Sequence, residues 1–138
     1  MRLQTFSVRR FFLVVIMNTL LIELPWPPSV NHYYRRVGHR TLISREGRKY
    51  RKEVCGILRN LHVRPLSEDL SMTVDAYPPD KRRRDLDNIQ KSLWDALQHG
   101  GAYNDDSQIK DFECHMHEPY RPNGKVVVRL QPRGGGRV

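Results

Sequence analysis

The sequence predicts a single small α+β domain in which two main helices accompany a mixed or antiparallel sheet. Apolar residues recur at helical spacing after Ser44 and again over residues 87–98. Apolar residues that alternate with polar ones indicate strands around 70–76, 108–116 and 124–131. Together with a short strand near the start, this order of elements favours an α+β domain.

The first strand is expected at residues 20–24, where five residues are apolar or acidic before a proline cluster. Pro25-Trp26-Pro27-Pro28 follows, and three prolines in four positions cannot continue a sheet ladder or a helix. We therefore expect a rigid extended turn there, and then a polar and aromatic loop over 29–43.

The first helix should begin after Ser44, whose hydroxyl can accept a hydrogen bond from a free backbone N–H. Its apolar stripe comprises Tyr50, Val54, Ile57, Leu58 and Leu61. The opposite face is strongly basic, with Glu46 and Glu53 as its acids. This face carries Arg45, Arg48, Lys49, Arg51, Lys52 and Arg59. Such one-sided charge is typical of a phosphate-binding surface more than of a merely solvated face.

The next strand, at 70–76, should end at Pro78 and Pro79, and the second helix should end at Gly100 and Gly101. The sequence beyond the last strand, residues 133–138, is glycine-rich and is expected to be a flexible tail.

The first sixteen residues are basic and then apolar, a pattern that faintly resembles a signal peptide. No small-residue cleavage site follows, and polar residues interrupt the apolar run well short of a membrane span. We interpret residues 1–16 as an extension upstream of a natural start at Met17, and residues 17–132 as the domain. A signal or membrane anchor is the alternative.

The composition points to a polyanionic partner. Lys and Arg outnumber Asp and Glu by 24 to 15, a formal net charge of +9. Nucleic acid or an acidic membrane surface would attract such a chain, and the clustering of the charge favours nucleic acid. Cys55 and Cys114 are the two cysteines and form no metal motif, so a reduced, cytoplasmic protein is the simplest interpretation.

The residues most suggestive of chemistry lie in the stretch 81–91, where four basic residues precede Asp85 and Asp87. If the backbone there is extended, these two carboxylates point the same way. Hard cations such as Mg²⁺ take oxygen ligands and keep several waters, so a few carboxylates and a substrate phosphate suffice. Asp87 should also cap the second helix, with Gln90 completing a capping box. Lys91 lies one turn further on the same face and could stabilise charge on a phosphate.

A third carboxylate is expected from the turn 104–107, with Asp106 as the candidate, provided that the fold returns this turn to the start of the second helix. The structural alternative is that Asp87 is only a cap, that Asp85 balances the arginines, and that Asp105, Asp106 and Ser107 form an ordinary turn.

Two further sets of side chains have alternative interpretations. Trp26, Tyr33 and Tyr34 could stack on unpaired bases, or they could belong to the core or to a dimer contact. His115 and His117 share one strand face, but a zinc site would need further ligands.

On these motifs the sequence resembles the RusA family of Holliday junction resolvases. The resemblance rests on residues 83–91, 95–97 and 105–109, and on an opening motif at 24–29 with Asn31 and 33–35. It extends from Met17 to about residue 130.

The resemblance implies a homodimeric, often prophage-borne nuclease that nicks four-way DNA junctions symmetrically, in recombination and repair. It implies Mg²⁺ as the cofactor, with Mn²⁺ as a substitute, and no membrane partner. Asp85, Asp87 and Asp106 match the family's catalytic, metal-binding carboxylates, and Lys91 matches its essential lysine, while Asp105 matches a less critical acid. For DNA contacts we expect Arg82, Arg83, Arg84, Asn88, Arg35, Arg36, Lys49 and Lys52.

Two other classes of protein explain part of the sequence. A non-catalytic, structure-selective DNA-binding protein would account for the charge, but its clustered acids would repel phosphate. A membrane-surface protein would account for the charge and the apolar start, but it leaves the motif at 85–88 without a role.

Overall fold

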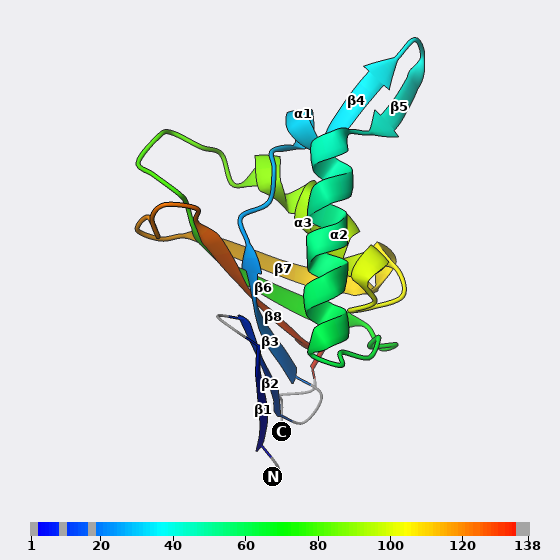
Figure 1. Cartoon of the computed structure of the whole chain (residues 1–138). Helices are drawn as coiled ribbons and strands as arrows, with labels where there is room; N and C mark the ends of the chain where they lie inside the picture. The colour runs from blue at the N-terminus through cyan, green and yellow to red at the C-terminus, as the bar shows by residue number, and fades with distance from the viewer. Residues whose placement is uncertain (1–2, 9–10, 17–18, 135–138) are drawn as a thin grey trace.

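The computed structural model describes residues 3–8, 11–16 and 19–134. These form an α+β domain in which helices cover one face of a mixed sheet (Figure 1). In chain order the elements are β1 (Leu3–Val8), β2 (Phe11–Ile16), β3 (Thr19–Pro25), α1 (Val30–Tyr33), β4 (Tyr34–Val37), β5 (Arg40–Ile43), α2 (Arg45–Asn60), β6 (Leu70–Tyr77), α3 (Asp87–Gly100), the 3₁₀ turn η1 (Asp106–Gln108), β7 (Ile109–Met116) and β8 (Lys125–Pro132).

The main sheet has six strands in the order β1-β2-β3-β8-β6-β7. Strands β6 and β7 are parallel, with α3 in the connection between them, and the other pairs are antiparallel. The sheet is therefore mixed, and the predicted fold class is confirmed. The four expected strands, which are β3, β6, β7 and β8, and the two main helices lie within a few residues of their expected positions, whereas β1, β2, β4 and β5 were not expected.

One face of the sheet is buried and the other is partly open to solvent. Buried and partly exposed residues accordingly alternate along β3, β6 and β8, because successive side chains of a strand point to opposite faces. Helices α2 and α3 cross the buried face (Figure 1). Their apolar stripes and the inward side chains of the strands form one core. Its strand members are Leu20, Ile22, Leu24, Leu70, Met72, Val74, Ala76, Val126, Val128 and Leu130.

The ends of the two helices follow the sequence with one exception. The Ser44 hydroxyl accepts a hydrogen bond from the Gly47 N–H at 2.9 Å, as predicted. Gly101 ends α3 in the left-handed conformation at φ 86°, which favours glycine. At the start of α3, however, the N-cap is Leu86 and no side chain caps the helix. The predicted capping box between Asp87 and Gln90 is therefore wrong.

Residues 29–43, expected as a loop, are ordered into α1 and a hairpin of β4 and β5. The hairpin projects beyond the end of α2, away from the main sheet (Figure 1). Its two-residue turn starts at Gly38, which has φ 62°. The prediction was wrong because the strands carry mostly exposed polar residues, and so lack the alternation that indicates a strand.

Strands β1 and β2 extend the sheet beyond β3 by antiparallel pairing. The end of the predicted tail, residues 135–138, lies outside the described residues. In the part of the chain that is described, no helix is long and apolar enough to cross a membrane.

Candidate active site

Helix α3 presents a polar face that contains two of the predicted site residues. Asp87 is the first residue of the helix, and Lys91 and Asp95 follow at intervals of four, which places all three on one face. Asp87 and Lys91 are exposed, whereas Asp95 is partly buried. Two turns of helix separate Asp87 from Asp95, about 12 Å along the axis. Lys91 thus lies between two acidic positions.

Asp85 precedes this face in a short irregular segment. Between it and Asp87, Leu86 has helical backbone angles, φ −61° and ψ −34°. The expected extended backbone is therefore not found here, and the argument that residues 85 and 87 point the same way does not hold. The chain turns toward the helix one residue early, as shown by the Asn88 N–H donating to the Asp85 carbonyl at 3.2 Å. Both carboxylates are nevertheless exposed.

Asp106 approaches α3, but it lies beside the later part of the helix and not beside its start, where the expected site required it. The Asp106 N–H donates to Gln98 Oε1 at 2.9 Å. The Tyr103 hydroxyl donates to Asp106 Oδ1 at 3.0 Å and also contacts the Trp94 carbonyl at 2.8 Å. These contacts hold the Asp106 carboxylate near the end of the α3 face that carries Asp95.

Burial is the main reason why the pKa of Asp106 is raised, and the charges of Asp95 and Asp105 raise it further. The hydrogen bond from Tyr103 opposes the shift. Asp105 has a structural role, because its carboxylate caps the 3₁₀ turn by accepting from Ser107 N–H at 2.9 Å. The turn-forming alternative is thus confirmed for Asp105.

An ion pair that was not predicted from the sequence joins α2 to this face. Arg51 donates to Asp95 Oδ2 through Nη2 at 2.7 Å and through Nε at 3.2 Å. The hydroxyl of Tyr33 donates to the same oxygen. Arg51, expected on the phosphate-binding face of α2, is therefore largely buried against α3 instead. No short-range signal identifies the pair, since 44 positions separate its members.

The aromatic residues after the proline cluster have different roles. Tyr33 is fully buried, so the core interpretation is confirmed for it. Tyr34 packs edge-on against Tyr33 with 4.9 Å between ring centroids. Lys91 Nζ lies 5.5 Å from the centroid of the Tyr34 ring. A continuous set of contacts therefore runs from Arg51 through Asp95 and the two tyrosines to Lys91.

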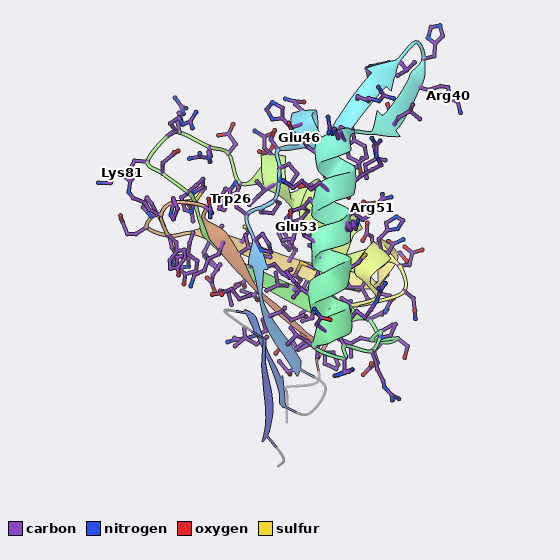
Figure 2. The ribbon with its side chains drawn as sticks, viewed as in Figure 1. Trp26, Arg40, Glu46, Arg51, Glu53 and Lys81 are labelled. Atoms are coloured by element: carbon purple, nitrogen blue, oxygen red, sulfur yellow. The ribbon has the colours of Figure 1, made fainter. Side chains whose placement is uncertain are left out.

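An open groove of about 560 Å³ lies beside Asp85. It brings together four predicted DNA contacts, since Arg82, Arg83, Arg84 and Asn88 all line it. The segment after β3 lines the same groove with Trp26, Pro27 and Pro28 (Trp26 is labelled in Figure 2).

Within the loop before α3, Asp80 organises two of the three arginines. Its carboxylate accepts from Arg84 Nη1 at 2.6 Å and from the Arg82 backbone N–H at 2.9 Å. These interactions hold the pKa of Asp80 well below its usual range, with the hydrogen bond from Arg84 as the largest cause. The carboxylate therefore fixes the shape of the loop.

The other predicted DNA contacts lie outside the groove. Arg35 and Arg36 are exposed on the projecting hairpin, and Lys49 and Lys52 are exposed on α2. Lys49 borders a second hollow that also contains Glu53 and Glu23, so the charge there is mixed.

The donor set suits a hard cation, because Asp85, Asp87 and Asp106 offer carboxylate oxygens alone. Within the described residues, no three His, Cys, Asp or Glu side chains form a group that could hold a metal ion together. Mg²⁺ in proteins is commonly held by one or two carboxylates, with waters and substrate phosphates completing its shell. The two exposed carboxylates at the start of α3 fit that pattern.

Exposed carboxylates beside a lysine and an arginine-lined groove, on a basic α+β domain, are features typical of the nuclease class. Comparison with known proteins points to the same class. The family model for endodeoxyribonuclease RusA matches residues 25–131. The chain belongs to the RusA family of endodeoxyribonucleases.

Curated relatives match almost end to end. The chain is 40% identical over 119 residues to the crossover junction endodeoxyribonuclease RusA of Escherichia coli K12, covering 86% of this chain and 98% of that protein. The proteins of the same name from Shigella sonnei and Enterobacteria phage 82 match at the same identity and coverage. Among solved structures, the periplasmic domain of Helicobacter pylori MotB aligns with a TM-score of 0.44 at 12% identity, which is too weak to support an argument.

Proposed function

We propose that this chain is a divalent-metal-dependent endodeoxyribonuclease that resolves Holliday junctions by paired, symmetric nicks. The observation that carries the proposal is the position of Lys91 between Asp87 and the Asp106 end of α3, beside an arginine-lined groove. The names of the curated relatives, crossover junction endodeoxyribonucleases, support a four-way junction as the substrate.

Asp85 and Asp87, which are exposed at the start of α3, would hold the cation. Asp106 is the third proposed catalytic carboxylate, and it lies beside the later part of the same helix. Mg²⁺ or Mn²⁺ there would neutralise phosphate charge and supply an activated water. The ammonium group of Lys91 would stabilise the charge that develops on the phosphate during hydrolysis. Tyr34 restricts where that ammonium group can lie, because its ring packs beneath it.

Basic side chains around the site would hold the DNA backbone. The groove arginines are closest to Asp85, while the hairpin and α2 carry the more distant contacts. A homodimer would present two such sites to a junction whose arms are themselves related by a two-fold axis. Recombination and repair are the processes in which such an activity is needed.

The test is cleavage of a synthetic four-way junction beside a linear duplex of the same sequence. We expect paired nicks in the junction with Mg²⁺, no cutting in EDTA, and no cutting by Asp87→Asn. Glu113→Gln, the same chemical change at an exposed carboxylate on β7, is the matched control and should cut normally.

The alternative of a non-catalytic, structure-selective DNA-binding protein makes a different prediction. Such a protein would bind the junction tightly without cutting it under any metal condition. Sedimentation of the protein with and without junction would show whether two copies act together.

A further inference from the structure

We propose that the groove beside Asp85 binds one unstacked nucleobase of the DNA substrate, next to the bond that is cut. This inference rests on the proposed function and deepens it, since it assigns a second task to the same site. The ligand is the base of a deoxynucleotide, and Trp26 is the surface on which it stacks.

The two walls of the groove have complementary chemistry. One wall is apolar, formed by Trp26 with Pro27 and Pro28, and the other is the basic loop that ends at Asp85. Aromatic rings accept the face of any base. A groove that bound the phosphate backbone alone would have no use for the apolar wall.

The apolar wall is held rigidly on both sides of the tryptophan. The Tyr50 hydroxyl on α2 donates to the Pro25 carbonyl at 2.8 Å. The Ser92 hydroxyl on α3, which is fully buried, donates to the Pro28 carbonyl at 2.7 Å. The segment between these anchors therefore keeps its position without a ligand, and little order has to be imposed when a base binds.

The basic wall is also fixed where it meets the tryptophan. The Arg84 guanidinium lies 6.0 Å from the centroid of the Trp26 ring. A hydrogen bond of 2.6 Å from Arg84 Nη1 to Asp80 Oδ1 holds the guanidinium there. Arg83 is exposed on the same loop. Asn88, at the start of α3, adds an amide that can hydrogen-bond the edge of a base. A base and its phosphate would both find partners here.

Stacking on Trp26 selects for an unstacked base. The groove, with a volume of about 560 Å³, has room for one base. A base inside a duplex has both faces covered by its neighbours and cannot stack on the Trp26 ring. Extracting a base from a stack costs least where the base is already unpaired or poorly stacked. The exchange point of a four-way junction offers such bases, so the groove would contribute to the choice of junction over duplex.

The first experiment measures junction binding in EDTA, where the strands stay intact. We expect Trp26→Ala to weaken binding by about five- to one-hundred-fold, and Trp26→Phe to weaken it less, because one stacked base contributes on that order. Replacing the nucleotide beside the cut with an abasic one should weaken wild-type binding to a similar degree. In Trp26→Ala, the abasic substitution should weaken binding little further, because the ring on which the base stacks is already missing.

The second experiment uses the tryptophan as a reporter. The chain has two tryptophans, so Trp94→Phe leaves Trp26 as the only one. Trp94 packs against Phe112, and its buried Nε1 has no hydrogen-bond partner among the residues that the structure describes, so the change to Phe should be tolerated. A short single-stranded oligonucleotide should quench the remaining fluorescence, whereas an abasic oligonucleotide of the same length should not.

The outcomes separate this inference from the proposed function. If wild-type protein cuts the junction, but the abasic substitution changes neither binding nor fluorescence, the base pocket is refuted and the nuclease stands. If the effects of the abasic substitution and of Trp26→Ala multiply, the base stacks elsewhere and the proposal also fails. If no condition gives cutting, the proposed function fails, while the fluorescence comparison still decides whether the groove binds a base.

Discussion

The ion pair between Arg51 and Asp95 leads to a quantitative prediction about the α2–α3 interface. Asp95→Ala removes a carboxylate that accepts two hydrogen bonds from Arg51 and one from the buried Tyr33. Both partners of the ion pair are partly buried, with side-chain exposures of 27% and 22%. The change therefore leaves one buried hydroxyl and one partly buried cation without a partner.

The magnitude follows from these contacts. A hydrogen bond to a charged group contributes about 1.5–3 kcal/mol to stability. Because about a quarter of each side chain of the pair remains in water, the Arg51 contribution falls to about 1 kcal/mol. Adding the Tyr33 bond gives a loss of about 2–3 kcal/mol in the free energy of unfolding. For a chain of this length that corresponds to roughly 6–12 °C in Tm.

Urea unfolding of Asp95→Ala, Arg51→Ala and the double variant measures the effect. The two single losses should fail to add, with a coupling energy of about 1 kcal/mol. Glu113→Ala, which breaks an exposed contact with His115, should change stability by less than about 0.5 kcal/mol. If Asp95→Ala behaves like this control, or if the losses of Asp95 and Arg51 simply add, the structural role assigned to the pair is refuted.

Three other predictions follow from the site and its surroundings. Lys91→Met should lower the single-turnover cutting rate by about 100- to 1,000-fold with little effect on junction binding, and an equal loss of binding would contradict a role in the reaction itself. Arg83→Ala should reduce the slope of the logarithm of the binding constant against the logarithm of the salt concentration by about 0.9. Arg82→Ala should reduce that slope less, because Asp80 holds the Arg82 side chain. A larger reduction for Arg82→Ala than for Arg83→Ala would contradict this assignment. Burial raises the pKa of Cys114 to about 11, so its alkylation rate should rise about ten-fold per pH unit from pH 8 to 10; a plateau near pH 9, measured by mass spectrometry, would be inconsistent with that shift.

Elements with a strong hydrophobic period could be predicted from the sequence, because burial on one face imposes that period. Strand β6 and helix α2 are examples, and Ser44 marks the start of α2. The hairpin of β4 and β5 has no such period, because it projects from the domain and buries little. A glycine at position 38 was the available signal, since a two-residue turn needs a positive φ there.

The site was harder to predict than the fold, because its contacts join distant parts of the chain. The sequence located Asp85, Asp87 and Lys91 within one short segment, which local spacing can do. It could not show that Asp106 approaches α3 through Tyr103 and Gln98, since that position depends on the packing of the whole turn. The prediction that Asp87 caps α3 was wrong for a local reason, because the preceding residue, Leu86, already has helical backbone angles.

The pairing of charges changes the interpretation of the net charge of +9. Several basic side chains are engaged by acids and contribute less to a DNA surface than a count suggests, such as Arg51 with Asp95 and Lys125 with Glu23 at 2.8 Å. Arg84 is likewise held by Asp80, and its position against Trp26 gives it a structural task. The positive charge available to phosphate therefore lies at the exposed residues of the hairpin, the outer face of α2 and the groove loop. Of these surfaces, the groove loop leads directly into the start of α3, where the exposed carboxylates would otherwise repel the DNA that they are proposed to cut.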